Sequence, residues 1–242
     1  MLQPWRTGIV TKIENETSTT KRFTIKIPEI DRFDFIPGQF VTLDLPIHEK
    51  KNKRWRSYSI ASWPDGTNEF ELVIVLLEGG LGTNYLFSEI QVGSELTMRG
   101  PQGVFTLHEP IERDLFFVCT GTGIAPFRSM VHHIKNNDIA HQNIYLIFGT
   151  RHIADCLYKQ ELEELQSELN GFFYMPTFSR ESENTQPIRK GYVHDVYEAI
   201  VNENKRDAFF YLCGWKNMID EAKQRIVALG YDRKDIHLEL YG

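Results

Sequence analysis

The sequence has few cysteines and lacks any long apolar run. Its 242 residues include three cysteines, Cys119, Cys156 and Cys213, which lie far apart and form no Cys-x-x-Cys pair. An iron–sulfur cluster usually takes four thiolates, and an odd cysteine count argues against a disulfide framework. No apolar stretch approaches the roughly 18–20 residues that span a bilayer, and residues 1–6 lack the layout of a signal peptide. These absences predict a cytoplasmic protein with no membrane partner.

Positive charge is also in short supply. The chain has 27 Lys and Arg against 33 Asp and Glu, a net charge of −6, which argues against nucleic acid as a partner. Its eight histidines show no metal-ligand spacing, so no metal site is expected. One basic run at residues 48–56 stands out, and it is either a solvated loop or a docking patch for an acidic protein or for phosphates. Both interpretations stay open, and the lysines concerned are Lys50, Lys51 and Lys53.

The first hundred residues have the pattern of short strands. Segments rich in β-branched and aromatic residues alternate with turn formers such as Pro37-Gly38 and Gly79-Gly80, which predicts an antiparallel β-barrel. One helix is expected after Gly82, as far as Ile90. The predicted strands are 8–13, 19–27, 40–45, 57–61, 69–76 and 95–99.

The pattern changes after about His108. Residues 115–119 form a continuous apolar run, which is typical of a strand buried on both faces. Strands and helices then alternate, which predicts right-handed crossovers and a parallel sheet. The predicted strands are 115–119, 144–148, 172–178, 209–213 and 236–240, and the helices are 125–135, 157–169, 193–201 and 218–229. The fold class is therefore a two-domain one, with a β-barrel over 1–108 and an α/β domain over 109–242.

Two glycine-rich segments sit where helices are expected to begin. Gly121-Thr122-Gly123 follows the first buried strand, and its backbone N–H groups and the next helix could hold a phosphate. Gly-x-Gly alone is often only a tight turn. Pro126 suits a first helical turn, and it replaces the last glycine of the Rossmann fingerprint, which argues against an ordinary Rossmann dehydrogenase. Gly82-Thr83-Asn84 offers a second helix start of this kind.

Six motifs occur in a characteristic order along nearly the whole chain. They are Arg56-Ser57-Tyr58-Ser59, Gly82-Thr83-Asn84, Gly100 to Phe105, Gly121 to Arg128, Tyr211 to Met218 and Glu239-Leu240-Tyr241. Together they resemble the ferredoxin–NADP reductase family, within the flavoprotein pyridine nucleotide cytochrome reductase superfamily. The resemblance implies a flavin-binding barrel and a nicotinamide-nucleotide-binding domain, with FAD favoured over FMN.

The resemblance also implies residue roles around the flavin. Arg56 would pair with the flavin phosphates, Tyr58 and Tyr241 would stack on opposite faces of the isoalloxazine, and Ser59 would hydrogen-bond near its N5. The helix start at Gly82, Thr83 and Asn84, with Ser57, completes the implied flavin site.

Cys213 and Glu239 are implied to lie at the nicotinamide. Cys213 would position the nicotinamide C4 without acting as a nucleophile, and Glu239 would tune protonation there. A buried structural cysteine and an exposed strand carboxylate are the alternatives. The loop Gly121-Thr122-Gly123 would bind the nucleotide phosphates.

NADP is favoured over NAD on a charge argument. Relatives grip the 2′-phosphate of NADP with a Ser, an Arg, a Lys and a Tyr, which here match Ser179, Arg180, Lys190 and Tyr192. NAD-using relatives also carry Lys-Gly-Tyr, so Arg180 carries most of the weight.

The function expected from these motifs is FAD-dependent electron transfer between NADPH and a one-electron carrier. An acidic ferredoxin or flavodoxin would suit the basic run at residues 48–56. Two alternatives stay open, an NADH-dependent reductase component of a multicomponent oxygenase and a non-catalytic nucleotide-sensing subunit.

Overall fold

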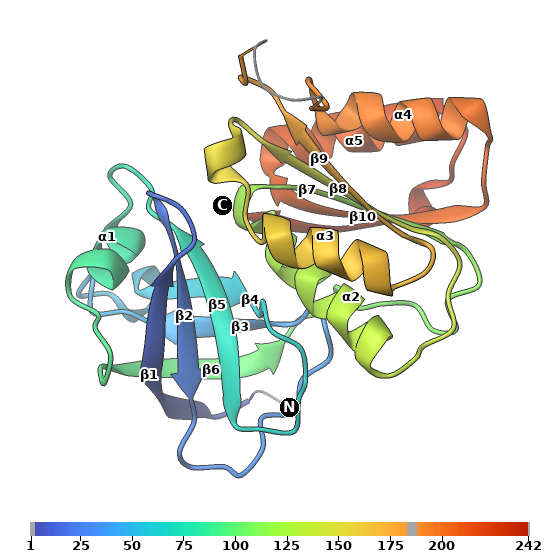
Figure 1. Cartoon of the computed structure of the whole chain (residues 1–242). Coiled ribbons are helices and arrows are strands. Elements are labelled where there is room, and N and C mark those ends of the chain that lie inside the picture. Colours follow the sequence, from blue (N-terminus) through green and yellow to red (C-terminus); the bar gives the residue numbers. More distant parts are fainter. Residues whose placement is uncertain (1–2, 183–187, 242) are drawn as a thin grey trace. The chain divides into compact units, whose positions relative to one another are not determined.

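The computed structural model describes residues 3–182 and 188–241 (Figure 1). Its contacts divide the chain into two compact units. The first unit takes in residues 1–107 and also residues 125–133, and the second takes in residues 108–124 and 134–242. Each unit has a sheet of its own, and the two sheets differ in the direction of their strands.

The first unit is built on six antiparallel strands in the order β4-β3-β6-β1-β2-β5. An isolated bridge between Ile60 and Leu72 joins the chain just after β4 to β5, so the two outer strands meet and the sheet closes into a barrel. The strands are β1 (Trp5–Asn15), β2 (Thr20–Lys26), β3 (Phe40–Asp44), β4 (Trp55–Ser59), β5 (Glu69–Val75) and β6 (Glu95–Gln102).

Alternating side chains fill the interior of this barrel. In β2, Phe23 and Ile25 are fully buried while Arg22 and Thr24 face outward, which is the period of two expected for a half-buried strand. Helix α1 (Leu81–Ser88) adds Leu86 to the same core. A 3₁₀ turn, η1 (Lys51–Lys53), lies between β3 and β4.

The second unit is built on five parallel strands in the order β11-β10-β7-β8-β9. Helices α4 and α5 pack on one face over an aromatic core that includes Phe116 and Phe210, and Figure 1 shows α3 on the other face. The strands are β7 (Asp114–Thr120), β8 (Ile144–Thr150), β9 (Phe172–Phe178), β10 (Ala208–Trp215) and β11 (Ile236–Tyr241). The helices are α3 (Lys159–Glu168), α4 (Val193–Glu203) and α5 (Lys216–Ala228), and the 3₁₀ turns are η2 (Gly121–Ile124), η3 (Ile153–Asp155) and η4 (Arg233–Asp235).

Helix α2 (Ala125–Asn136) begins directly after η2, and most of its length belongs to the first unit. The predicted fold class is confirmed: an antiparallel barrel precedes a parallel α/β sheet. Strand β6 runs on to Gln102 where the sequence predicted an end at Arg99. Beyond Arg99 it pairs with β3 alone, so Pro101 can lie in the strand although it has no N–H to donate.

Across residues 3–182 and 188–241, we find no helix with the length and apolar character that crossing a membrane would require.

Candidate functional site

Strand β4 carries the predicted flavin motif. Arg56 donates through Nη1 to the carbonyl oxygens of Lys53 at 3.1 Å and Trp55 at 2.8 Å, and it pairs with no carboxylate within the described part of the chain. Ser57 is exposed, and its hydroxyl lies 3.1 Å from that of Thr42. The guanidinium is therefore held by its own loop and keeps its charge available for an anion.

Tyr58 and Ser59 complete the motif and are less accessible. Tyr58 packs against the barrel core, and burial raises the pKa of its phenol to about 12, so the ring stays neutral. Ser59 ends the strand opposite Phe40, and only 4% of the residue is exposed. The structure thus places Arg56, Tyr58 and Ser59 within one strand. Arg56 and Tyr58 are partly exposed, and Ser59 is buried.

The start of helix α1 lies against Arg56. A Cβ placed on Gly82 would meet the Cγ of Arg56 at 3.1 Å and its Nε at 3.2 Å, so only glycine leaves this guanidinium its present position. The first turn of a helix presents N–H groups without partners inside the helix, and together with an arginine that pairs with no described carboxylate these suit a phosphate. The flavin pyrophosphate therefore fits this corner of the barrel.

Thr83 and Asn84 are occupied with the turn before the helix. The Thr83 hydroxyl donates to the Gly80 carbonyl at 3.1 Å and accepts from the Leu77 N–H at 3.1 Å. The Asn84 amide also donates to the Gly80 carbonyl, at 2.9 Å. Their side chains shape the turn, and the Asn84 N–H already donates to the Gly80 carbonyl at 2.9 Å, so a phosphate here would be bound by the backbone N–H groups of Gly82 and Thr83.

In the second unit, the loop after β7 interlocks with the end of β10. A Cβ on Gly123 would lie 2.4 Å from the Cys213 carbonyl oxygen, and one on Gly214 would lie 2.4 Å from the Thr120 hydroxyl oxygen. Gly121 has a φ of +55° and no atom within 4 Å of its Cβ position. Packing alone thus requires glycine at Gly123, whereas Gly121 leaves open space beside the backbone. The binding of phosphates by Gly121, Thr122 and Gly123 stays a prediction.

The hydroxyl of Thr120 supports a polar ligand at this loop. It is buried and has no hydrogen-bond partner within the described residues. Buried polar atoms are rarely left unsatisfied without a reason, and one reason is an absent ligand. A nucleotide therefore fits the carboxyl ends of β7 and β10, where open α/β sheets bind their ligands.

Cys213 and Glu239 lie side by side across the sheet. Cys213 is fully buried, and the parallel register of β10 and β11 places it opposite Glu239. On its other side Cys213 is opposite Cys119, and burial, reinforced by the Cys213 and Cys156 thiols, raises the pKa of Cys119. The three cysteines that are distant in sequence therefore lie close enough to affect one another.

Tyr241 ends β11 with its backbone opposite that of Trp215. The stacking predicted for its ring lies outside what the structure describes.

The predicted nucleotide residues at the end of β9 come together through backbone contacts. The backbone N–H of Ser179 donates to the Thr150 carbonyl at 3.0 Å, and that of Arg180 donates to the Arg151 carbonyl at 3.0 Å. An isolated parallel bridge joins Phe178 to Lys190. Tyr192 precedes α4 and is 66% exposed. Ser179, Arg180 and Lys190 thus share one edge of the unit.

Two further cations join this edge that the sequence analysis missed. Arg151 follows β8 as Arg180 follows β9, and the carbonyl of Arg189 accepts a hydrogen bond from the N–H of Phe178 at 3.0 Å. Arg151, Arg180 and Arg189 are exposed and make no ion pair within the described residues. The sequence offered one signal for these residues. Arg151 follows the carboxyl end of a parallel strand, and Arg189 lies close in sequence to the predicted Lys190.

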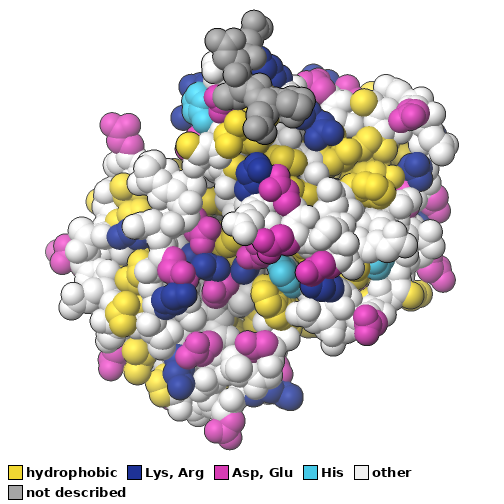
Figure 2. All heavy atoms as spheres, in the orientation of Figure 1, with side chains coloured by type: hydrophobic (Ala, Val, Ile, Leu, Met, Phe, Trp, Pro, Cys, Tyr) yellow, Lys and Arg dark blue, Asp and Glu magenta, His cyan; other side chains and the backbone are white. Residues whose placement is uncertain are grey.

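The basic run before β4 is also exposed. Lys50, Lys51 and Lys53 face solvent, whereas Arg54 is tied to Asp44 by an ion pair of 2.7 Å. Figure 2 shows that acidic and basic side chains are interspersed over the pictured face of the molecule. Lys50, Lys51 and Lys53 make no ion pair with any residue that the structure describes.

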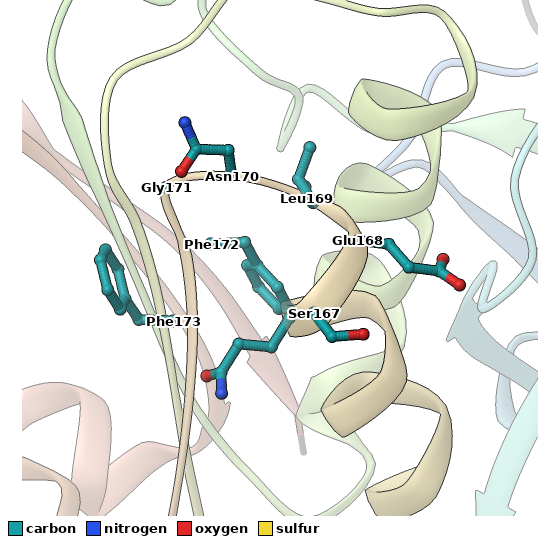
Figure 3. A pocket seen from close by; sticks show the side chains of 8 residues that line it. Ser167, Glu168, Leu169, Asn170, Gly171, Phe172 and Phe173 are labelled. Carbon is teal, nitrogen blue, oxygen red and sulfur yellow. The ribbon is translucent and has the colours of Figure 1, made fainter.

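A pocket in the second unit lies away from all these residues. It is lined by the turn between α3 and β9, from Gln166 to Phe173 (Figure 3). This turn is at the amino end of β9, whereas ligands of open parallel sheets bind at the carboxyl ends. None of the predicted site residues lines it.

Comparison with known families matches both halves of the chain. Residues 7–107 match the family described as oxidoreductase FAD-binding domain, and residues 117–224 match the oxidoreductase NAD-binding domain.

Several curated relatives are similar over most of this chain. Ferredoxin–NADP reductase B of Sorangium cellulosum is 34% identical over 216 residues, which cover 86% of each chain. The electron transfer component of anthranilate 1,2-dioxygenase from Acinetobacter baylyi is 32% identical over 89% of this chain, which spans only 61% of that relative's length. A ferredoxin NADP⁺ reductase from Neisseria gonorrhoeae, solved with FAD and NADP, shares the fold with a TM-score of 0.81 at 23% identity, covering 98% of both chains.

Proposed function

This chain belongs to the ferredoxin–NADP reductase-like family of FAD- and NAD-binding oxidoreductases, and on that premise we propose that it transfers electrons between NADPH and a one-electron carrier. When bound, a flavin accepts a hydride from a nicotinamide and returns electrons singly. We assign FAD binding to residues 1–108 and nucleotide binding to residues 109–242. The observation that carries the proposal is the Arg56 guanidinium, which lies against the first turn of α1 and pairs with no carboxylate among the described residues.

In this proposal the barrel binds and orients the flavin. Arg56 and the backbone N–H groups at the start of α1 hold its phosphates. Tyr58, neutral because burial raises its pKa to about 12, supports one face of the ring system. The Ser59 hydroxyl hydrogen-bonds near N5, and Tyr241 supports the face that the nicotinamide takes over.

The α/β unit binds the nicotinamide nucleotide. Gly121 and the Thr120 hydroxyl, which has no hydrogen-bond partner among the described residues, hold the diphosphate region, and Cys213 positions the nicotinamide C4. The role assigned to Cys213, which is fully buried, is to position the nicotinamide and not to act as a nucleophile, and Glu239 beside it holds or moves a proton. Positioning of this kind contributes to rate without any covalent step on the protein.

NADPH is the preferred nucleotide in this proposal. A 2′-phosphate is a dianion, and the edge formed by Ser179, Arg180 and Lys190 gains two more cations, Arg151 and Arg189, which make no ion pair with the described residues. The planar guanidinium of arginine can donate two parallel hydrogen bonds to two oxygens of one phosphate. The ribose hydroxyl of NADH offers only one oxygen and no charge. We expect Arg180→Ala to weaken NADPH binding about 10- to 100-fold while leaving NADH binding within twofold, since one charge-assisted contact contributes about 1.5–3 kcal/mol.

The electron partner is proposed to be an acidic ferredoxin or flavodoxin. Lys50, Lys51 and Lys53 are exposed, carry no ion pair within the described residues, and lie directly before the Arg56 strand. Opposite charge on the partner would steer the encounter and raise its rate.

The first experiment follows the flavin directly. The purified chain should carry a yellow flavin that is bleached anaerobically by NADPH much faster than by NADH. An Arg180→Ala variant that needs about 10- to 100-fold more NADPH than wild type for the same bleaching rate, with unchanged bleaching by NADH, supports the nucleotide assignment. Flavin that neither nucleotide bleaches would contradict the catalytic proposal and favour the sensing alternative.

A second candidate is the NADH-dependent reductase component of an oxygenase. The similarity to the electron transfer component of anthranilate 1,2-dioxygenase favours it. A clear preference for NADH in the same experiment would select this candidate over the first.

A further inference from the structure

Arg128 is a buried arginine for which the proposed function gives no role. It lies in α2, within the first compact unit, and only 3% of it is exposed. Its Nη1 donates to a Glu71 carboxylate oxygen at 2.7 Å and to the Ala61 carbonyl at 2.9 Å. Its guanidinium also lies over the ring of Trp63, 5.2 Å from the centroid. The partners named here all lie in β5 or in the segment that directly follows β4.

The segment that Arg128 contacts is the point where the barrel closes. After Ser59 the chain leaves β3 and turns toward β5, since the N–H of Ile60 donates to the Gln39 carbonyl at 3.0 Å and that of Ala61 donates to the Glu71 carbonyl at 2.8 Å. Arg128 therefore holds both sides of the closure, by the Ala61 carbonyl on one and by the Glu71 carboxylate on the other.

A buried ion pair needs an explanation beyond stability. Burying two charges costs desolvation energy that their attraction often fails to exceed, and apolar replacements of similar volume are frequently as stable. An apolar residue in α2 could pack against Trp63, which already stacks on His132 with 3.9 Å between the ring centroids. What an apolar residue could not do is fix the direction of the Ala61 carbonyl, two residues from Ser59.

We infer that Arg128 is a positioning residue, which orients the Ser59–Ala61 backbone and thereby the Ser59 hydroxyl toward the flavin. The inference rests on the proposed function, because the role of Ser59 does. Arg128 touches neither cofactor in this account and acts only through the end of β4. Its loss should slow the reductive step without weakening nucleotide binding.

A double-mutant cycle with Ser59 tests this route of action. Anaerobic stopped-flow bleaching by NADPH gives a limiting rate and an apparent dissociation constant for each variant. Arg128→Met should lower the limiting rate at least fivefold in the wild-type background and less than twofold in the Ser59→Ala background. The dissociation constant for NADPH should stay within twofold. A smaller slowing, or an equal slowing in both backgrounds, overturns the inference.

Arg22→Met is the matched control. Arg22 reaches the other oxygen of the Glu71 carboxylate at 3.6 Å, from strand β2. It carries the same charge to the same partner, so its removal should leave the limiting rate within twofold. A loss as large as that of Arg128→Met would show that only the charge on Glu71 matters, which also overturns the inference.

Hydrogen exchange on the full chain without nucleotide supplies a readout independent of turnover. The Ala61 and Glu71 amides, which close the barrel, should exchange at least tenfold faster in Arg128→Met, while Arg128→Lys, which keeps the charge, should restore part of both protection and rate. Unchanged protection in Arg128→Met overturns the inference. If Arg128→Met does not fold, the test passes to Arg128→Lys, and wild-type protection together with a wild-type rate in that variant overturns the inference. A wild-type chain that no nucleotide bleaches would instead refute the proposed function, and the exchange result would still stand.

Discussion

Replacing Gly82 by alanine should separate flavin binding from the stability of the protein. The new Cβ would lie 3.1 Å from the Cγ of Arg56 and 3.2 Å from its Nε, closer than side chains normally approach, so the guanidinium must move. Gly82 lies inside α1 and does not need a positive φ, so alanine should suit the helix, by up to about 1 kcal/mol. The free energy of unfolding should therefore stay the same or rise in the flavin-free protein.

The expected loss in flavin affinity follows from the displaced contact. A hydrogen bond to a charged group contributes about 1.5–3 kcal/mol, and 1.4 kcal/mol corresponds to a factor of ten in an equilibrium constant. Loss of one Arg56–phosphate contact should thus weaken FAD binding by about 10- to 100-fold. Quenching of flavin fluorescence on titration with apoprotein measures the affinity, and urea unfolding of the apoprotein measures the stability.

Ser88→Ala is the control for the helix itself. Ser88 lies in the last turn of α1 and its hydroxyl donates to the Asn84 carbonyl at 2.9 Å, away from Arg56. This variant should change neither FAD affinity nor the redox behaviour. If Gly82→Ala bound FAD as tightly as wild type, or if it lost affinity only because the apoprotein unfolded, the assignment of this corner as the phosphate site would be refuted.

Two further predictions concern charge and pH. Reversing Lys50, Lys51 and Lys53 to Glu should slow reduction of an acidic ferredoxin about tenfold at low ionic strength, with little change at high salt or with a small dye acceptor; equal losses with both acceptors would argue against a docking patch. Burial lowers the pKa of His194 below its ordinary value of 6.5. Below about pH 6.5 the imidazole is therefore protonated more fully in the unfolded chain than in the native protein, so the free energy of unfolding should fall as the pH drops. Urea midpoints at pH 7.5 and 5.5 should differ less in His194→Gln than in wild type, and an unaltered difference would contradict this reasoning.

The fold could be predicted because each half of the chain carries its own hydrophobic period. Residues 115–119 are apolar at every position, as a strand covered on both faces requires, whereas β2 alternates around Phe23 and Ile25. The end of β6 was missed because Pro101 normally interrupts a strand, and only the sheet order shows that its missing N–H faces no partner.

The site was predictable only where its parts are local in sequence. The strand motif Arg56-Ser57-Tyr58-Ser59 is one such part. The contact of Gly123 with the Cys213 carbonyl requires the order of the parallel strands, which no short motif contains. Arg128 and Glu71 are 57 positions apart, and neither has a local pattern that points to the other.

The division of helix α2 has a consequence for how the protein is made. The first unit takes in residues 125–133, which the ribosome adds only after the whole of β7. Until then Glu71 has no Arg128 to neutralise it, and the carbonyl of Ala61 has no donor from the helix. A nascent chain that ends at residue 107 can therefore form the backbone bonds that close the barrel, but it still lacks the Arg128 side chain that holds both sides of the closure.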